Sequence, residues 1–113
     1  MQKWKIKLQS YRRKHRQSNQ EEITWEEAYE KREKENGILV DVRSTQEYNE
    51  GHIDGAICIP HYELENNAQA KLAQKDQTII LYCQTGARSK KAYQTLKKLG
   101  YQNVYEVKGG INN

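Results

Sequence analysis

The sequence predicts an α/β domain in which a parallel sheet carries helices on both faces. Short apolar runs at 38–42, 56–59, 78–82 and 103–107 are too brief for helices, and the first and third are rich in β-branched residues. Segments with helical signals separate these runs, and the connections are short. Strands that alternate with helices in this way form right-handed crossovers, which make the strands of the sheet parallel.

Two helix starts are marked by capping boxes, in which two residues bind each other's backbone amides. Thr24 with Glu27, and Ser44 with Glu47, have the required spacing. The first stretch ends at an Asn-Gly pair after residue 35, which suits the left-handed backbone of a helix end, and the second ends at a glycine. We therefore expect a charged helix before the 38–42 strand and a short helix after it.

The second half of the chain continues the alternation. A modest helix is expected at 64–74, before the run at 78–82, which is apolar throughout and therefore predicts a central strand covered on both faces. Ala92, Leu96 and Leu99 then recur at helical spacing. The sheet should end with the 103–107 strand.

Composition favours one small domain with a basic N-terminal segment. The chain has 113 residues, of which 35% are hydrophobic and 30% charged. Residues 1–20 hold seven of the 19 Lys and Arg and no acidic residue, so the other 12 bases accompany all 15 acids in 21–113. We expect 1–20 to form a flexible arm that makes weak contacts with anionic surfaces and binds no specific nucleic acid. Residues 21–113 are expected to fold.

The sequence carries no signal for secretion, membrane insertion or a metal site. No apolar run approaches the roughly 20 residues that span a bilayer, and the first residues lack the apolar stretch of a secretion signal. Cys58 and Cys83 lack the close pairing of a zinc site. We therefore expect a cytoplasmic protein with reduced cysteines and no metal or cofactor.

Cys83 is the strongest candidate for a reactive residue. It directly follows the predicted central strand, at the edge where parallel sheets bind ligands. The loop at 83–89 leads straight into a helix, so its backbone amides can surround the sulfur. These amides, the helix dipole and Arg88 would favour the thiolate. A cysteine at a strand end is as often an inert core residue, so the interpretation depends on these neighbours.

Four stretches of the chain carry recognisable motifs. The Cys-x-x-Gly-x-Arg-Ser motif at 83–89 resembles the active-site loop of the rhodanese family of sulfurtransferases, and Asp-Val-Arg at 41–43 resembles its Asp-x-Arg element. The stretch at 47–60 is similar to its helix-to-strand signature, and the glycine pair at 109–110 matches the pair after its last strand. The resemblance covers roughly residues 22–111 in the family's order.

This resemblance implies a five-stranded, mainly parallel sheet and transfer of sulfane sulfur through a persulfide on Cys83. The sulfur would come from thiosulfate or a persulfide donor and pass to a thiol, small or protein-borne, in a two-stage covalent reaction. Asp41 and Arg43 are expected to support the site, because a strand-end Asp often binds backbone amides and Arg43 is spaced to pair with Glu47. The expected substrate-binding residues are Gln84, Thr85, Gly86, Ala87, Arg88 and Ser89.

Two further residues receive structural interpretations. Histidine often serves as a general base, yet His52 lies within the family-like 47–60 stretch, and a thiolate stabilised by the amides of the Cys83 loop needs no base. Cys58 belongs to the apolar 56–59 run and is expected to be buried and unreactive.

Two other functions compete with this interpretation. A phosphatase or arsenate reductase would also use a Cys-to-Arg loop. Only four residues lie between Cys83 and Arg88, however, where the phosphatase pattern has five, and Tyr82 stands where tyrosine phosphatases have histidine. A persulfide carrier or regulatory binding module would keep the fold without turnover, and the presence of Cys83 argues against an inactive module.

The C-terminal end departs from the family pattern. Family members usually continue past the glycine pair to a tryptophan and a final helix, whereas this sequence stops at Asn113. We expect the domain to lack that extension, which would leave part of the sheet or the pocket rim less covered. A monomer or a weak dimer over the exposed face is expected.

Overall fold

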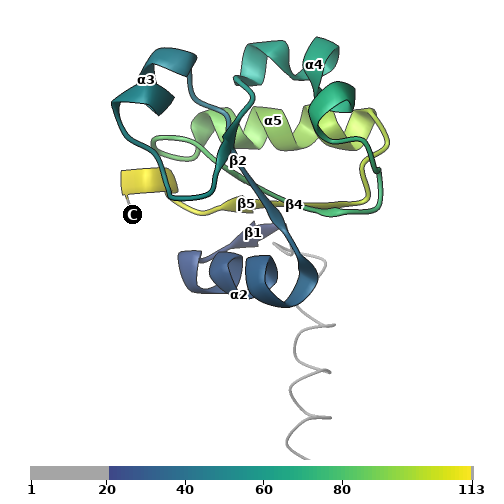
Figure 1. The fold of residues 1–113 in the computed structure, drawn as a ribbon, viewed down its shortest axis with the longest axis horizontal. Coiled ribbons are helices and arrows are strands. Elements are labelled where there is room, and N and C mark those ends of the chain that lie inside the picture. Colours follow the sequence, from purple (N-terminus) through teal and green to yellow (C-terminus); the bar gives the residue numbers. More distant parts are fainter. Residues whose placement is uncertain (1–20, 113) are drawn as a thin grey trace, which may run out of the picture.

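Five parallel strands form the centre of the molecule, in the spatial order β1-β5-β4-β2-β3 (Figure 1). The computed structural model describes residues 21–112, so the predicted arm at 1–20 lies outside the described residues. Each of the four strand pairings is parallel, which confirms the predicted sheet. The strands are β1 (Glu22–Ile23), β2 (Ile38–Asp41), β3 (Ile57–Cys58), β4 (Thr78–Tyr82) and β5 (Asn103–Val107).

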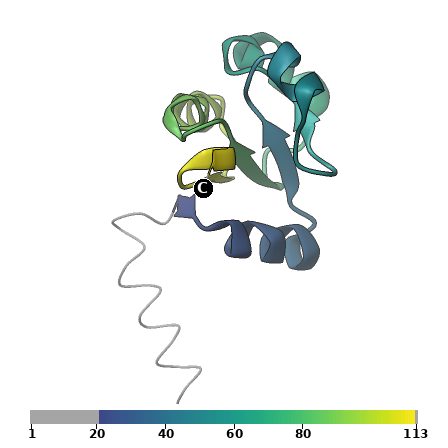
Figure 2. The same cartoon turned by 90° about the vertical axis from the view of Figure 1, so that its left-hand side faces the viewer.

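Helices cover both faces of this sheet. One helix, α2, lies against one face, while α4 and α5 lie on the other, as two perpendicular views show (Figures 1 and 2). No helix among residues 21–112 is long and apolar enough to cross a bilayer. The helices are α2 (Trp25–Glu35), α3 (Thr45–Glu50), α4 (Leu64–Lys71) and α5 (Ala87–Lys98), with 3-10 turns η1 (His61–Glu63) and η2 (Gly110–Asn112).

Both predicted capping boxes are present. The Thr24 hydroxyl accepts a hydrogen bond from the Glu27 amide at 3.1 Å, and the Glu27 carboxylate accepts one from the Thr24 amide at 2.9 Å. Ser44 and Glu47 repeat the arrangement at 3.1 and 3.0 Å. Asn36 ends α2 with a φ of 55°, in the left-handed region that the sequence predicted.

Some element ends differ from the prediction by a few residues. The third strand begins at Ile57 because the amide of Ala56 binds the Ile53 carbonyl in a turn. The helix predicted at 64–74 stops at Lys71. These shifts leave the order and direction of the elements unchanged.

The core consists of two apolar layers, one on each side of the sheet. Successive strand residues point to opposite faces, so Ile80 and Tyr82 pack toward α2 while Ile79 and Leu81 pack toward α4 and α5. Every residue of β4 is buried, as expected for a central strand. The layer under α4 and α5 consists of Val40, Val42, Ile59, Leu64, Ala68, Leu72, Ile79, Leu81, Cys83, Ala92, Leu96, Tyr101 and Val104.

Candidate active site

Cys83 lies at the carboxyl end of β4, and two backbone amides point at its sulfur. The amide of Gly86 donates to Sγ at 3.0 Å and the amide of Ser89 donates at 3.3 Å. The Ser89 hydroxyl oxygen lies 3.7 Å from the same sulfur. The residue is only 1% exposed, so these donors act on the sulfur with little competition from water.

The backbone of Gly86 makes this arrangement possible. Its φ of 108° lies in a region that side-chain-bearing residues rarely adopt, and it turns the loop back toward Sγ. Gly86 precedes α5 but offers no side chain to cap it. The amide of Ser89 belongs to the first turn of α5, where amides lack partners within the helix, and Sγ accepts it. The Cys83 sulfur therefore acts as the N-terminal cap of α5.

The predicted glycine pair after β5 packs directly on this loop. In η2, the amide of Ile111 donates to the Cys83 carbonyl at 2.8 Å, and the amide of Asn112 donates to the Gln84 carbonyl at 3.2 Å. A Cβ atom on Gly110 would lie 2.5 Å from the Cys83 carbonyl oxygen. The close approach of these two backbones explains the need for glycine at this position.

Arg88 forms a two-pronged ion pair with Glu47 of α3. Its two terminal nitrogens lie 2.6 and 3.0 Å from the two carboxylate oxygens. Hydrogen bonds from Arg88, and next from the Ser44 amide, lower the pKa of Glu47 to about 2. The spacing in the sequence predicted that Glu47 pairs with Arg43. Arg43 pairs with Asp41 instead, so that prediction is wrong. Direct binding of an anion by Arg88 stays a prediction.

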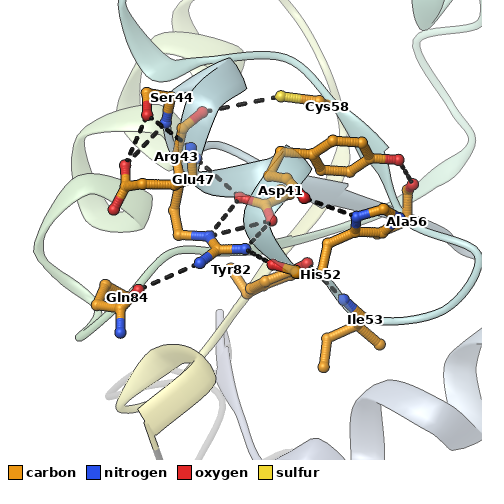
Figure 3. Close-up of polar contacts among 12 residues, drawn as sticks. Asp41, Arg43, Ser44, Glu47, His52, Ile53, Ala56, Cys58, Tyr82 and Gln84 are labelled. Carbon is orange, nitrogen blue, oxygen red and sulfur yellow. Dashed lines mark hydrogen bonds and ion pairs between the residues drawn. The ribbon is translucent and has the colours of Figure 1, made fainter.

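Asp41 and Arg43 form a buried ion pair beside the loop (Figure 3). Arg43 Nε lies 3.0 Å from Asp41 Oδ1, and Nη2 lies 2.7 Å from Oδ2. The same guanidinium donates to the Gly51 carbonyl at 2.7 Å and to the Gln84 side-chain oxygen at 3.2 Å. The Asp41 carboxylate also accepts the Arg43 amide at 2.9 Å, as expected for a strand-end Asp. These contacts tie β2 and the end of α3 to the candidate loop, which supports the predicted supporting role.

Within the described residues, His52 contacts Tyr48 and the Cys58 sulfur contacts the Arg43 carbonyl, so neither side chain is placed on the sulfur of Cys83. The His52 ring stacks on Tyr48 at 3.7 Å and meets the Tyr48 carbonyl oxygen at 2.8 Å, so its contacts are structural. Cys58 is half-buried, so the expectation that it is buried is wrong, because the short β3 leaves it at the sheet edge. Burial still raises the pKa of the Cys58 thiol, which disfavours its reactive form.

Arg88 and Lys91 place positive charge close to His61. Burial lowers the pKa of His61, and the charges of Arg88 and Lys91 lower it further. The lowered pKa favours neutral His61, so the cations that these interactions place near the loop are Arg88 and Lys91. Nothing in the sequence indicated that His61 lies near Arg88, because the two residues are far apart in the chain, whereas Lys91 follows Arg88 by one helical turn.

Comparison with known proteins agrees with the fold and the motif order. The family model for the rhodanese-like domain matches residues 24–113. The chain belongs to the rhodanese-like family. Its structure resembles the human single-domain sulfurtransferase TSTD1, with a TM-score of 0.71 and 28% identity, covering 81% of this chain and 92% of that one. It also resembles a rhodanese with anions from E. coli, with a TM-score of 0.62 and 33% identity, covering 67% and 88% of the two chains.

Curated relatives of this rhodanese-like domain include longer proteins. It is 40% identical over 83 residues to a tRNA uridine(34) hydroxylase of Buchnera aphidicola, covering 70% of this chain and 27% of that protein. It is 45% identical over 75 residues to the probable adenylyltransferase/sulfurtransferase MoeZ of Mycobacterium tuberculosis, covering 65% and 19%. The chain thus spans about a quarter or less of these relatives.

Proposed function

We propose that this rhodanese-like domain is a sulfurtransferase that carries sulfane sulfur as a persulfide on Cys83. The donor would be thiosulfate or a persulfide, and the acceptor a thiol. The observation that carries the proposal is the pair of amides from Gly86 and Ser89 that donate to Sγ. Fixed donors of this kind stabilise negative charge without reorganising during the reaction.

The reaction proceeds by two displacements at sulfur. The Cys83 thiolate attacks the outer sulfur of thiosulfate, a new S–S bond forms, and sulfite leaves with the electron pair of the old S–S bond. An acceptor thiolate then attacks the outer sulfur of the persulfide, and Cys83 leaves as a thiolate. Both steps keep a negative charge on sulfur beside the loop amides.

The length of the loop favours a sulfur donor over a phosphoryl substrate, and the nearby cations favour a donor that is an anion. Arg88 and Lys91 lie close enough to His61 to lower its pKa, and these two cations attract anions. In this structure both terminal nitrogens of Arg88 bind Glu47, so direct contact between the guanidinium and any tetrahedral anion, thiosulfate or phosphate, would require that ion pair to open. The loop also keeps one residue fewer than the phosphatase pattern.

The setting proposed for this reaction is the cytoplasm. Both cysteines are free thiols, and Cys83 must be reduced to attack a donor. A persulfide carrier would load sulfur in the same way but would release it only to its protein partner. Repeated turnover with thiosulfate and a small thiol therefore separates the enzyme from the carrier.

Intact mass after incubation with thiosulfate tests the proposal. We expect a gain of one sulfur atom that cyanide removes. Cys83→Ser should abolish the gain, while Cys58→Ser, the matched control, should keep it. Sulfur loading on the Cys83→Ser variant would refute the assignment of the nucleophile.

A further inference from the structure

A buried carboxyl contacts the serine that lies beside the candidate nucleophile. Glu106 of β5 is 3% exposed, and its Oε1 lies 3.1 Å from the Ser89 hydroxyl oxygen. That hydroxyl oxygen lies 3.7 Å from Cys83 Sγ, and it also contacts the Gly86 carbonyl at 3.0 Å. A continuous polar path thus runs from the sulfur through one hydroxyl to one carboxyl.

The position of Glu106 is unusual for an acidic residue. It lies two residues after the buried Val104 on β5, so both side chains point to the face that α5 covers. Burying a carboxylate costs free energy, and an apolar residue would fill this place at lower cost. Such a group is a candidate for a chemical role. The sulfur transfer steps described above leave it unused.

Burial, more than the charges around it, favours the protonated form of Glu106. Its second oxygen, Oε2, lies 3.8 Å from Lys90 Nζ of α5, and Lys90 also binds Glu22 of β1. Burial raises the pKa of Glu106, the charges of Glu21 and Glu22 raise it further, and Lys90 and Ser89 lower it.

Among the other ionisable groups, Tyr93 of α5 is also close enough to interact electrostatically with Glu106. The net effect of these neighbours is a raised pKa for Glu106. A neutral Glu106 would also be compatible with both contacts of the Ser89 hydroxyl. The hydroxyl has one proton and faces two oxygen acceptors, and a protonated Glu106 could donate to it instead of competing for its proton.

We propose that Cys83 and Glu106 share one proton through the Ser89 hydroxyl. The S–H bond of Cys83 breaks as its proton moves to Ser89 Oγ, while the proton of that hydroxyl moves to Glu106 Oε1. The products are a thiolate and a neutral carboxylic acid, so the buried group keeps one negative charge throughout. The role of this relay in catalysis rests on the proposed sulfur transfer. Glu106 acts through Ser89 and does not touch the substrate.

Titration of the full chain, followed by the ultraviolet absorbance of the thiolate, tests the relay without any sulfur donor. Two groups that share a proton titrate as a pair, so thiolate should appear in two steps more than about one pH unit apart. Glu106→Gln should give a single step, because Gln keeps the hydrogen bond but takes no proton. Ser89→Ala should also give a single step. Glu22→Gln is the matched control, since it alters the charge beside Lys90 without touching Ser89, and it should keep two steps.

A measurement on the unsubstituted protein guards against variants that fail to fold. The carbon-13 signal of the Glu106 carboxyl should shift in both pH ranges in which thiolate appears. A Glu106→Gln curve that matches the wild-type curve, or a carboxyl signal that ignores thiolate formation, overturns the proposal. A protein that titrates in two steps but takes no sulfur from thiosulfate or a persulfide would retain the relay and refute the proposed function.

Discussion

Gly110 lies outside the candidate loop, but replacing it with alanine should distort that loop. The new Cβ would lie 2.5 Å from the Cys83 carbonyl oxygen and 2.6 Å from the Gln84 carbonyl oxygen, both backbone atoms that cannot swing aside. The φ of 66° adds about 1 kcal/mol of strain for a residue with a side chain. Forcing extra volume into a packed site costs typically about 1 to 3 kcal/mol. We therefore expect a loss of about 2 to 4 kcal/mol in the free energy of unfolding.

Gly100→Ala provides the control for this experiment. Gly100 has a φ of 96°, but an added Cβ would meet only the end of the Lys75 side chain at 4.0 Å. The Gly100→Ala variant therefore introduces the same kind of backbone strain without a steric clash. Urea denaturation gives the free energies, and the mass gain with thiosulfate gives the rate of sulfur loading. Equal stability of the two variants, with wild-type loading in Gly110→Ala, would show that η2 does not position the loop.

Two other predictions concern the ion pairs around the site. Glu47→Gln should remove an acid-sensitive part of the stability: the pKa of Glu47 falls from its usual 4.5 to about 2 in the folded protein, so its contribution is complete above about 4.5 and is lost as the pH falls toward 2. Urea midpoints measured across that range should fall more steeply in the wild type than in the variant, and parallel curves would contradict the assignment. Asp41→Asn should lower the free energy of unfolding by about 3 to 5 kcal/mol, because it leaves the buried Arg43 guanidinium without its counter-charge. A loss within about 0.5 kcal/mol, the range of ordinary surface substitutions, would show that this pair does not hold β2 to the loop.

Local signals in the sequence predicted most of the fold. The capping boxes at Thr24 and Ser44 and the apolar run at β4 depend on neighbours within a few residues, and all three are confirmed. The run at 56–59 shortened to two paired residues because the turn before it takes the amide of Ala56. A strand at the edge of a sheet depends on one partner only, so its length follows from the turn beside it as well as from its own residues.

Contacts between distant parts of the chain were beyond the reach of spacing arguments. Glu47 and Arg88 are 41 positions apart, and Ser89 and Glu106 are 17 apart. Glu106 follows the buried Val104 on the same face of β5, and this alternation is the signal that the sequence offered for it. A lone acidic residue in a short strand has many explanations, and only the position of α5 over the sheet gives it a partner.

The capping of α5 by a sulfur atom links the reactive group to the order of a whole helix. Helix N-termini are commonly capped by a Ser, Thr, Asp or Asn side-chain oxygen that does not react, whereas here the acceptor for the Ser89 amide is the atom proposed to gain and lose sulfur. Alkylation or oxidation of Cys83 would disturb the first turn of α5 as well as block the reaction. Hydrogen exchange at the Ser89 amide would then report the chemical state of the cysteine directly.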